Sequence, residues 1–453
     1  MGLPRLCRPG GEPLENGTRE TDYDLSEDPM TYRRIGLVSI AVLIALVIIA
    51  FALIWRPELT ATAEGAEPAY GKDEIARGYA LAQLGNCESC HTAEDGAAYA
   101  GGRPLDTPFG TIFAVNITPD RETGIGEWSP EAFTRAMRKG VDREGAHLYP
   151  AFPYTSFTKI DDGDISALYA YLRTVPAVEN EAPENALPFP FNIRALMAGW
   201  NLLFLDAGPV KAVSRESDEW NTGRYLVEGV THCGACHTPR NALGAEKSSD
   251  SLAGAEIDGW YAPPLAGDGA RAWNKPQLAA YLSAGFSRDH GAAAGPMGET
   301  VTNLSKVAPA DVTAIATYVA SLTDDTSPAF AAIDNGVPDD LAATHALWVG
   351  ACASCHEAAD GRANPSYGVP LSVGFALRGD KPLNAARTIV GGIDAYRDRG
   401  GPYMPAFGGT LTAEQITDLT QYVRARFSDG AAWEGVGDTV EQALSEQNEG
   451  DGQ

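Results

Sequence analysis

The stretch Cys87-Glu88-Ser89-Cys90-His91 recurs twice more in the chain, as Cys233-Gly234-Ala235-Cys236-His237 and Cys352-Ala353-Ser354-Cys355-His356. A Cys-x-x-Cys-His spacing is that of covalent c-type haem attachment. Two thiols one helical turn apart can reach the two vinyl groups of a haem, and the histidine that follows lies under the iron as its proximal ligand. The three copies therefore predict three covalently bound haem c groups, with His91, His237 and His356 on the iron.

Two other kinds of site use paired cysteines, a thioredoxin-like Cys-x-x-Cys and half of a zinc site. A zinc site needs a second pair of ligands, and the sequence holds no lone Cys-x-x-Cys or His-x-x-x-His that could supply one. Six of the seven cysteines belong to the three haem stretches, and Cys7 is the seventh. We therefore favour haem attachment and interpret Cys7 as a free thiol.

The N-terminal end combines a polar leader with an apolar run. Residues 1–34 show no apolar periodicity and are predicted to be a disordered cytoplasmic leader. Residues 35–54 contain no charge, and at about 1.5 Å per residue they would cross a bilayer as a transmembrane anchor. The alternative is a secretory signal cleaved at Ala61-Thr62-Ala63, although the run is longer than a usual signal core. We expect an anchor in the bacterial cytoplasmic (inner) membrane, with the haem domains in the periplasm.

Each haem stretch lies in a repeat with helical periodicity. A short helix leads into the stretch, another helix begins at a proline and ends at a glycine, and an amphipathic helix closes the repeat. The prolines are Pro130, Pro276 and Pro382, and the glycines are Gly140, Gly285 and Gly392. This arrangement resembles the small all-α cytochrome c fold, in which helices enclose a haem. We predict an all-α chain with one N-terminal transmembrane helix followed by three tandem cytochrome c (class I-like) domains.

The repeats divide the chain into seven regions. They are the leader at 1–34, the anchor at 35–54, a first cytochrome c domain at 70–178, an interdomain segment at 179–215, a second domain at 216–325, a third domain at 339–430 and an acidic tail at 431–453. The interdomain segment is rich in aromatic residues, which indicates packing between domains or a docking surface. The tail has no Lys or Arg and is predicted to be disordered.

Two methionines fall at the same place in the second and third repeats. Met297 and Met404 each lie twelve residues after the glycine that ends the helix, and both are next to a proline. A thioether at this point can take the open face of the iron, and His/Met ligation raises the potential of a haem. We therefore predict Met297 and Met404 as distal ligands.

The first repeat departs from this pattern. The same distance from Gly140 reaches Phe152, which cannot bind iron. Met137 and His147 are the other possible donors in the repeat, and we place Met137 before His147. The distal ligand of the first haem stays open, and an open iron would suit a haem enzyme or a binder of small ligands.

The charge balance limits the partners. The chain has 34 basic and 60 acidic residues, a formal charge of −26 at neutral pH. This charge argues against binding to nucleic acid, whose backbone is itself anionic. It would also steer basic electron-transfer partners at low salt.

Several further motifs make the sequence recognisable. They include Thr107-Pro108-Phe109-Gly110-Thr111, Asn116-Ile117-Thr118-Pro119-Asp120, Gly124-Ile125-Gly126-Glu127-Trp128-Ser129, Thr238-Pro239-Arg240-Asn241 and Met404-Pro405-Ala406-Phe407. With these motifs the chain resembles the three-haem cytochrome c subunit of bacterial membrane-bound alcohol, fructose, gluconate and aldehyde dehydrogenases. The resemblance implies a periplasmic electron-transfer subunit that is not itself catalytic. It would pass electrons from a dehydrogenase catalytic subunit towards quinone or another respiratory acceptor. Phe152, where many members have Met, and the N-terminal anchor depart from the family pattern.

Overall fold

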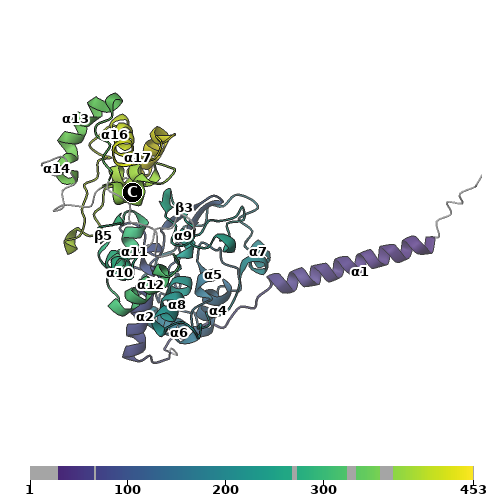
Figure 1. The fold of residues 1–453 in the computed structure, drawn as a ribbon. Coiled ribbons are helices and arrows are strands. Elements are labelled where there is room, and N and C mark those ends of the chain that lie inside the picture. The colour runs from purple at the N-terminus through teal and green to yellow at the C-terminus, as the bar shows by residue number, and fades with distance from the viewer. Residues whose placement is uncertain (1–28, 66–67, 268–272, 324–332, 358–370, 452–453) are drawn as a thin grey trace, which may run out of the picture. The chain divides into compact units, whose positions relative to one another are not determined.

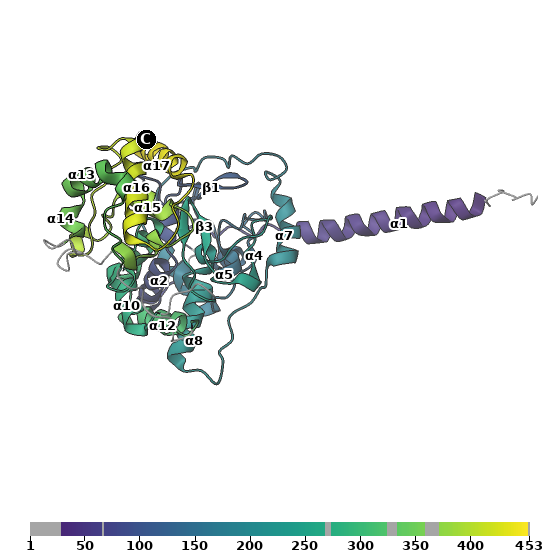
Figure 2. The ribbon, with the colours of Figure 1, turned by 45° about the horizontal axis from the view of Figure 1, so that its top comes forward.

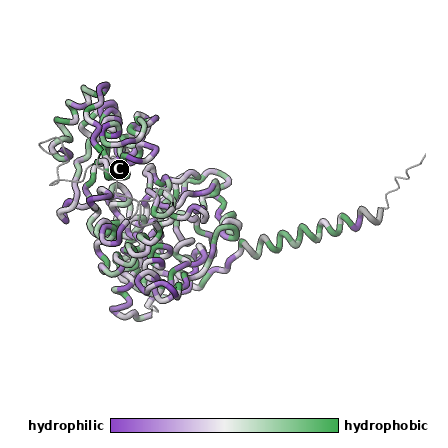
Figure 3. The backbone as a smooth tube through the Cα atoms, in the orientation of Figure 1, coloured by the Kyte–Doolittle hydropathy of each residue, from purple (hydrophilic) through white to green (hydrophobic). Residues whose placement is uncertain are grey.

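The computed structural model describes residues 29–65, 68–267, 273–323, 333–357 and 371–451. The chain divides into two units, residues 1–55 and residues 56–453. The first unit holds α1 (Pro29–Ile54), along which most side chains are apolar and exposed (Figure 3). The leader predicted at 1–34 lies largely outside the described residues, as does Cys7, and its described end at 29–34 is helical.

The predicted transmembrane anchor is not supported. A membrane crossing needs about 20 consecutive apolar residues. Arg33 and Arg34 lie inside α1, and its unbroken run of described uncharged side chains covers 35–49. Across the residues that the structure describes, no helix combines the length and the apolar character that a membrane span requires. The prediction of an anchor at 35–54 is therefore wrong, and so is the placement in the bacterial inner membrane that depended on it.

The second unit contains the three repeats in chain order. The first repeat has α2 (Lys72–Leu84), α3 (Cys87–Cys90), β1 (Pro104–Thr107), β2 (Gly110–Phe113), α4 (Pro130–Lys139), α5 (Tyr154–Phe157) and α6 (Asp162–Leu172). The interdomain segment follows with η1 (Arg194–Leu196) and α7 (Met197–Phe204). The second repeat has α8 (Asp218–Tyr225), η2 (Leu226–Val230), α9 (Gly234–His237), η3 (Ser248–Asp250), β3 (Ala255–Ile257), β4 (Trp260–Ala262), α10 (Lys275–Ala284), β5 (Phe286–Ser287), β6 (Gly291–Ala292), α11 (Pro296–Leu304) and α12 (Pro309–Ala320).

The third repeat and the tail complete the unit, and α13, α16 and α17 lie together in both views (Figures 1 and 2). The elements are η4 (Asp339–Leu341), α13 (Ala342–Ala351), α14 (Ala353–His356), η5 (Leu371–Val373), η6 (Phe375–Leu377), α15 (Leu383–Gly391), η7 (Arg397–Arg399), α16 (Ala413–Phe427) and α17 (Val436–Asp451). The tail that was predicted to be disordered therefore forms α17. Val436, Val440 and Ala443 recur at helical spacing and are buried with side chains of α15 and α16, which explains why the tail folds.

Opening and closing helices cross closely in the first two repeats. A Cβ atom on Gly78 of α2 would lie 1.9 Å from the carbonyl oxygen of Ala167 in α6. A Cβ atom on Gly223 of α8 would lie 1.9 Å from the carbonyl oxygen of Ala314 in α12. Because no side chain fits at either crossing, glycine allows the two helix backbones to touch.

Large aromatic side chains fill the matching place in the third repeat. The rings of Trp348 in α13 and Tyr422 in α16 lie 5.6 Å apart, and both residues are buried. The helices α13 and α16 therefore meet through side chains and not through a glycine contact.

The fold is not purely helical, which corrects the predicted all-α class. Three two-stranded antiparallel sheets pair β1 with β2, β3 with β4 and β5 with β6. Asp258 and Gly259 join β3 to β4 with φ angles of 51° and 69°. A two-residue Asp-Gly turn with both residues at positive φ matches the twist of a hairpin. This dipeptide was a hairpin signal in the sequence that the helical periodicity obscured.

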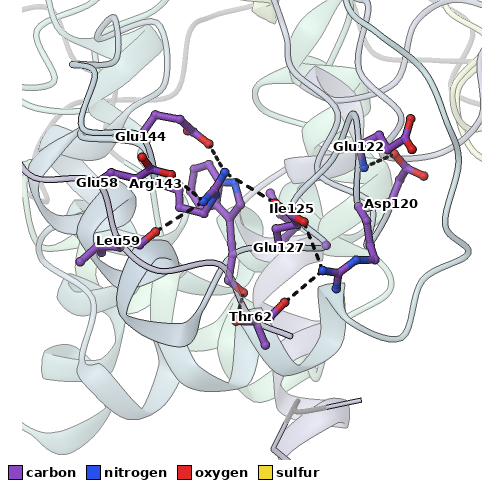
Figure 4. A network of polar contacts seen from close by, with 12 residues as sticks. Glu58, Leu59, Thr62, Asp120, Glu122, Ile125, Glu127, Arg143 and Glu144 are labelled. Atoms are coloured by element: carbon purple, nitrogen blue, oxygen red, sulfur yellow. Dashed lines mark hydrogen bonds and ion pairs between the residues drawn. The ribbon is translucent and has the colours of Figure 1, made fainter. Parts of the chain in front are cut away.

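Residues just after position 55 are bound to the first repeat by an arginine network (Figure 4). Arg143 lies 3.2 Å from Glu58 and 2.8 Å from Glu144, and its backbone carbonyl accepts a hydrogen bond from Leu59. Arg121 donates to the carbonyl of Thr62 at 3.2 Å (Figure 4). These bonds hold the start of the second unit along the face of its first cytochrome domain.

Candidate haem site

Each Cys-x-x-Cys-His stretch forms a single helical turn. The amide of the histidine donates to the carbonyl of the first cysteine at 3.0 Å for His91, 2.9 Å for His237 and 3.0 Å for His356. This turn places the two sulfurs of a stretch on one side, with the histidine directly after them. The local fold is thus the one that attachment to two vinyl groups requires.

The first two histidines are oriented by backbone carbonyls. His91 Nδ1 lies 2.6 Å from the carbonyl oxygen of Val115, and His237 Nδ1 lies 2.7 Å from that of Pro263. A carbonyl only accepts, so Nδ1 carries the hydrogen and Nε2 keeps its lone pair. Burial lowers the pKa of both histidines, which favours this neutral form. An imidazole held in this way is ready to bind iron through Nε2.

The carbonyls come from two hairpins that the helical periodicity of the sequence did not indicate. Val115 follows β2 by two residues, and Pro263 follows β4 directly. Each hairpin therefore presents one backbone oxygen to the histidine of its own repeat. No side-chain motif marks a backbone carbonyl, but the Asp258-Gly259 turn could have located the second hairpin.

One cavity of about 1530 Å³ joins the three stretches. His91, His237 and His356 all line it, together with Cys87, Cys90, Cys233, Cys236 and Cys352. A site for one small molecule usually has about 300–1,000 Å³, so this cavity exceeds the needs of a single ligand. Its size, its apolar lining and the oriented histidines fit several haem groups.

The predicted distal side chains reach the same cavity. Met297, the second residue of α11, lines it, and so does Met404. The backbone of Met404 is fixed by an antiparallel bridge with Ile393, through hydrogen bonds of 2.8 and 2.9 Å. The structure thus brings both methionines to the wall of the cavity that holds the histidines.

In the first repeat the cavity wall carries Phe152 and Met137. Met137 is 3% exposed and belongs to α4, as a core helix position would. His147 is buried beside Val141 and is not among the described residues that line the cavity. Of the two alternative donors, Met137 is therefore the one placed near a haem.

The thiols argue against the two other cysteine chemistries. Burial raises the pKa of Cys87 to about 12 and that of Cys236 and Cys352 to about 11. Redox-active and zinc-binding cysteines act as thiolates and are held in surroundings that lower their pKa. Within the described ranges, no group of three or more His, Cys, Asp or Glu side chains is placed to hold a metal ion.

Comparison with known proteins agrees with this site. Residues 75–176 and 222–323 match the family described as cytochrome c, and residues 339–423 match cytochrome C oxidase, cbb3-type, subunit III. The chain is 36% identical over 394 residues to the fructose dehydrogenase cytochrome subunit of Gluconobacter japonicus, covering 80% of this chain and 81% of that protein. It is 33% identical over 404 residues to the alcohol dehydrogenase (quinone), cytochrome c subunit, of Gluconobacter oxydans, covering 82% and 83%.

A third relative is much longer than this chain. This nicotinate dehydrogenase subunit of Pseudomonas putida is 45% identical over 409 residues, which are 88% of this chain and 34% of that protein. The chain therefore spans about a third of this relative's length. Together these matches confirm the resemblance to cytochrome subunits that the motifs indicated.

Proposed function

Because the chain belongs to the family of cytochrome c subunits of bacterial dehydrogenases, we propose that it conducts electrons through three covalently bound haem c groups. When bound, haem c supplies the reversible one-electron change of its iron. The observation that carries the proposal is the single cavity lined by the histidines of all three stretches. Sites that share one cavity allow electrons to pass between haems inside the chain.

The chain's own residues attach, orient and enclose the haems. The attachment residues are Cys87, Cys90, Cys233, Cys236, Cys352 and Cys355, and the proposed iron ligands are His91, His237, His356, Met297 and Met404. The carbonyls of Val115 and Pro263 hold the first two imidazoles with Nε2 towards the iron. The apolar wall keeps water from the irons, which with His/Met ligation raises the potential.

The proposed electron donor is the catalytic subunit of a dehydrogenase, and the acceptor is quinone or another respiratory carrier. Support comes from the names of the relatives, which are cytochrome subunits of fructose dehydrogenase and of a quinone alcohol dehydrogenase. Purification of the native complex, followed by identification of the co-purifying subunits, tests the donor. Reoxidation of the substrate-reduced complex by a soluble quinone tests the acceptor.

The number of haems is tested by intact-mass measurement of the denatured protein. Covalent attachment should leave three haem masses on the chain, and a redox titration should then show three one-electron steps. A chain that retains fewer than three haem masses after expression with a competent haem-attachment system contradicts the proposal.

A second function is favoured by Phe152 at the wall of the first site. A benzyl side chain cannot bind iron, so the first haem could bind carbon monoxide, oxygen or peroxide at its distal face. Carbon monoxide binding to the reduced protein, together with a peroxidase assay, separates this function from electron conduction. Turnover of peroxide by the first haem would favour the haem enzyme.

A further inference from the structure

The glycine that ends the third helix of a repeat is covered by a tyrosine ring in the first two repeats. Gly140 ends α4 at φ 58°, and a Cβ atom there would lie 2.6 Å from the ring of Tyr154. Gly285 ends α10 at φ 76°, and a Cβ atom there would lie 2.3 Å from the ring of Tyr396. Tyr154 belongs to the same repeat as its glycine, whereas Tyr396 belongs to the third repeat.

The second repeat has a charged residue where the first has this tyrosine. Tyr154 stands two residues after Phe152, and the residue two positions after Met297 is Glu299. Glu299 extends to the first repeat, where it pairs with Arg103 at 3.2 Å. The place over Gly285 is therefore filled by the third repeat.

Tyr396 contacts the helix that begins at Met297. It is 1% exposed and packs in a cluster with Ala293 and Val301, against which Met297 also packs. A Cβ atom on Gly298, the neighbour of Met297, would lie 3.3 Å from the hydroxyl of Tyr396. The ring thus touches the first turn of α11 as well as the end of α10.

The two tyrosines differ in what their hydroxyls do. Tyr154 donates to Asn201 Oδ1 at 2.6 Å. The hydroxyl of Tyr396 is buried and has no hydrogen-bond partner in the part of the chain that the structure describes. The contribution of Tyr396 to the second repeat is therefore the shape of its ring.

A second side chain of the third repeat grips the other end of α11. Arg399 Nη2 donates to Thr302 Oγ1 at 3.2 Å, and its Nη1 donates to Ser305. Its guanidinium also lies 5.5 Å from the centre of the Tyr396 ring. The helix that carries Met297 is thus held by the first repeat through Glu299 and by the third repeat through Tyr396 and Arg399.

We propose that Tyr396 is a positioning residue for Met297, so that the third repeat completes the second haem site. This inference rests on the proposed function, in which Met297 is the distal ligand of the second haem. A methionine side chain has three rotatable bonds and adapts to any gap beside it. Iron ligation needs one fixed position of the sulfur, and the ring wedged between Gly285 and Gly298 fixes the backbone from which that sulfur extends.

The test uses the full chain with Met404→Leu, so that only the second haem keeps a methionine. The readouts are the charge-transfer absorption from methionine to ferric iron and the reduction potential of that haem. Tyr396→Ala and the milder Tyr396→Leu should lose most of the absorption and lower the potential, as Met297→Leu does. Tyr396→Phe should keep both, because the hydroxyl has no partner among the described residues.

A matched control weakens the same contact between repeats away from Met297. Asn384 of the third repeat exchanges two hydrogen bonds of 2.8 Å with the backbone of Tyr261 in the second. Asn384→Ala should keep the absorption and the potential. Intact mass shows that each variant retains its three haems before the spectra are compared.

The outcomes separate the two proposals. Absorption that is lost in Met297→Leu but kept in both Tyr396→Leu and Tyr396→Ala overturns the positioning role and leaves the ligand assignment standing. Absorption that survives Met297→Leu overturns both, because another group then binds the iron. Loss in Tyr396→Leu with retention in Tyr396→Phe and Asn384→Ala supports the inference.

Discussion

The first and second repeats share one frame and differ at the distal position. In both, a glycine lets the outer helices touch, and a hairpin presents a carbonyl to the proximal histidine. At the distal wall, however, one has Phe152 and the other has Met297. The contacts that build the repeat and orient its histidine therefore do not require a particular distal side chain. This independence allows one chain to hold haems with different ligands and different potentials.

The largest expected effect comes from removing the attachment of one haem. We expect Cys233→Ala with Cys236→Ala to lose one haem mass and to unfold the second repeat, because a domain of about 100 residues has a thin apolar core without its haem. Cys87→Ala with Cys90→Ala should do the same to the first repeat. Intact mass and thermal melting followed by circular dichroism measure both effects.

Since Tyr396 couples the repeats, the two double variants also differ in reach. Loss of the second haem should disturb the third repeat, which packs on the second, more than loss of the first haem does. Equal effects on the third repeat would show that the contact through Tyr396 has no energetic weight.

The next effect exchanges the one position at which the repeats differ. Phe152→Met should give the first haem a thioether ligand, raise its potential and abolish any binding of carbon monoxide to it. Met297→Phe should do the reverse at the second haem. Resonance Raman or magnetic circular dichroism identifies the ligands, and redox titration gives the direction of each shift.

Met137→Leu is the control for this exchange. If wild type already has three His/Met low-spin haems, and Met137→Leu leaves all of them intact, the alignment that placed Phe152 at the distal position is wrong. If Met137→Leu removes one of them, Met137 is the distal ligand of the first haem.

Much of the frame was predictable because it depends on spacing within a repeat. The three haem stretches, the helix beginning at Pro130 and the helix ends at Gly140 and Gly285 are all local patterns, and the structure has these helix boundaries where they were expected. The matches to cytochrome subunits confirm the family that the motifs indicated. Local patterns succeed here because each repeat encloses its own haem.

What could not be predicted depends on contacts between distant segments. Nothing in the spacing around Tyr396 says that its ring fills a place in another repeat. The acidic composition of the tail hid the helical spacing of Val436 and Val440, which bury α17 against the third repeat. The apolar run at 35–54 suggested an anchor, but the described part of the chain contains no helix able to span a membrane.

A smaller effect concerns the helix crossings. Gly78→Ala places a methyl group 1.9 Å from the carbonyl oxygen of Ala167, and forced overpacking costs about 1–3 kcal/mol. Gly223→Ala should destabilise the second repeat similarly, because its crossing has the same distance to Ala314. Urea unfolding followed at the haem absorption of each repeat measures the loss.

Gly163→Ala is the matched control, since a Cβ atom at this position of α6 would have no neighbour within 4 Å. Replacing a helical glycine with alanine in open space should stabilise the protein by about 0.5–1 kcal/mol. If Gly78→Ala is as stable as Gly163→Ala, the helices can separate and the close crossing is not needed for the fold.

The smallest effect compares the carboxylates at the start of the two opening helices. Glu74 of α2 accepts a hydrogen bond from Ser166 at 2.9 Å, and Glu219 of α8 accepts from Lys275 and Thr317. The bond from Lys275, followed by the bond from Thr317, lowers the pKa of Glu219. A carboxylate with a lowered pKa stabilises the folded state above its unfolded pKa of about 4.3, and this contribution is lost as the pH falls through the folded value. The free energy of unfolding of wild type should therefore fall more steeply below about pH 4.3 than that of Glu219→Gln or Lys275→Gln. Gly163→Ala should keep the wild-type slope, and equal slopes in all four proteins would show that the pair does not contribute to the stability of the second repeat.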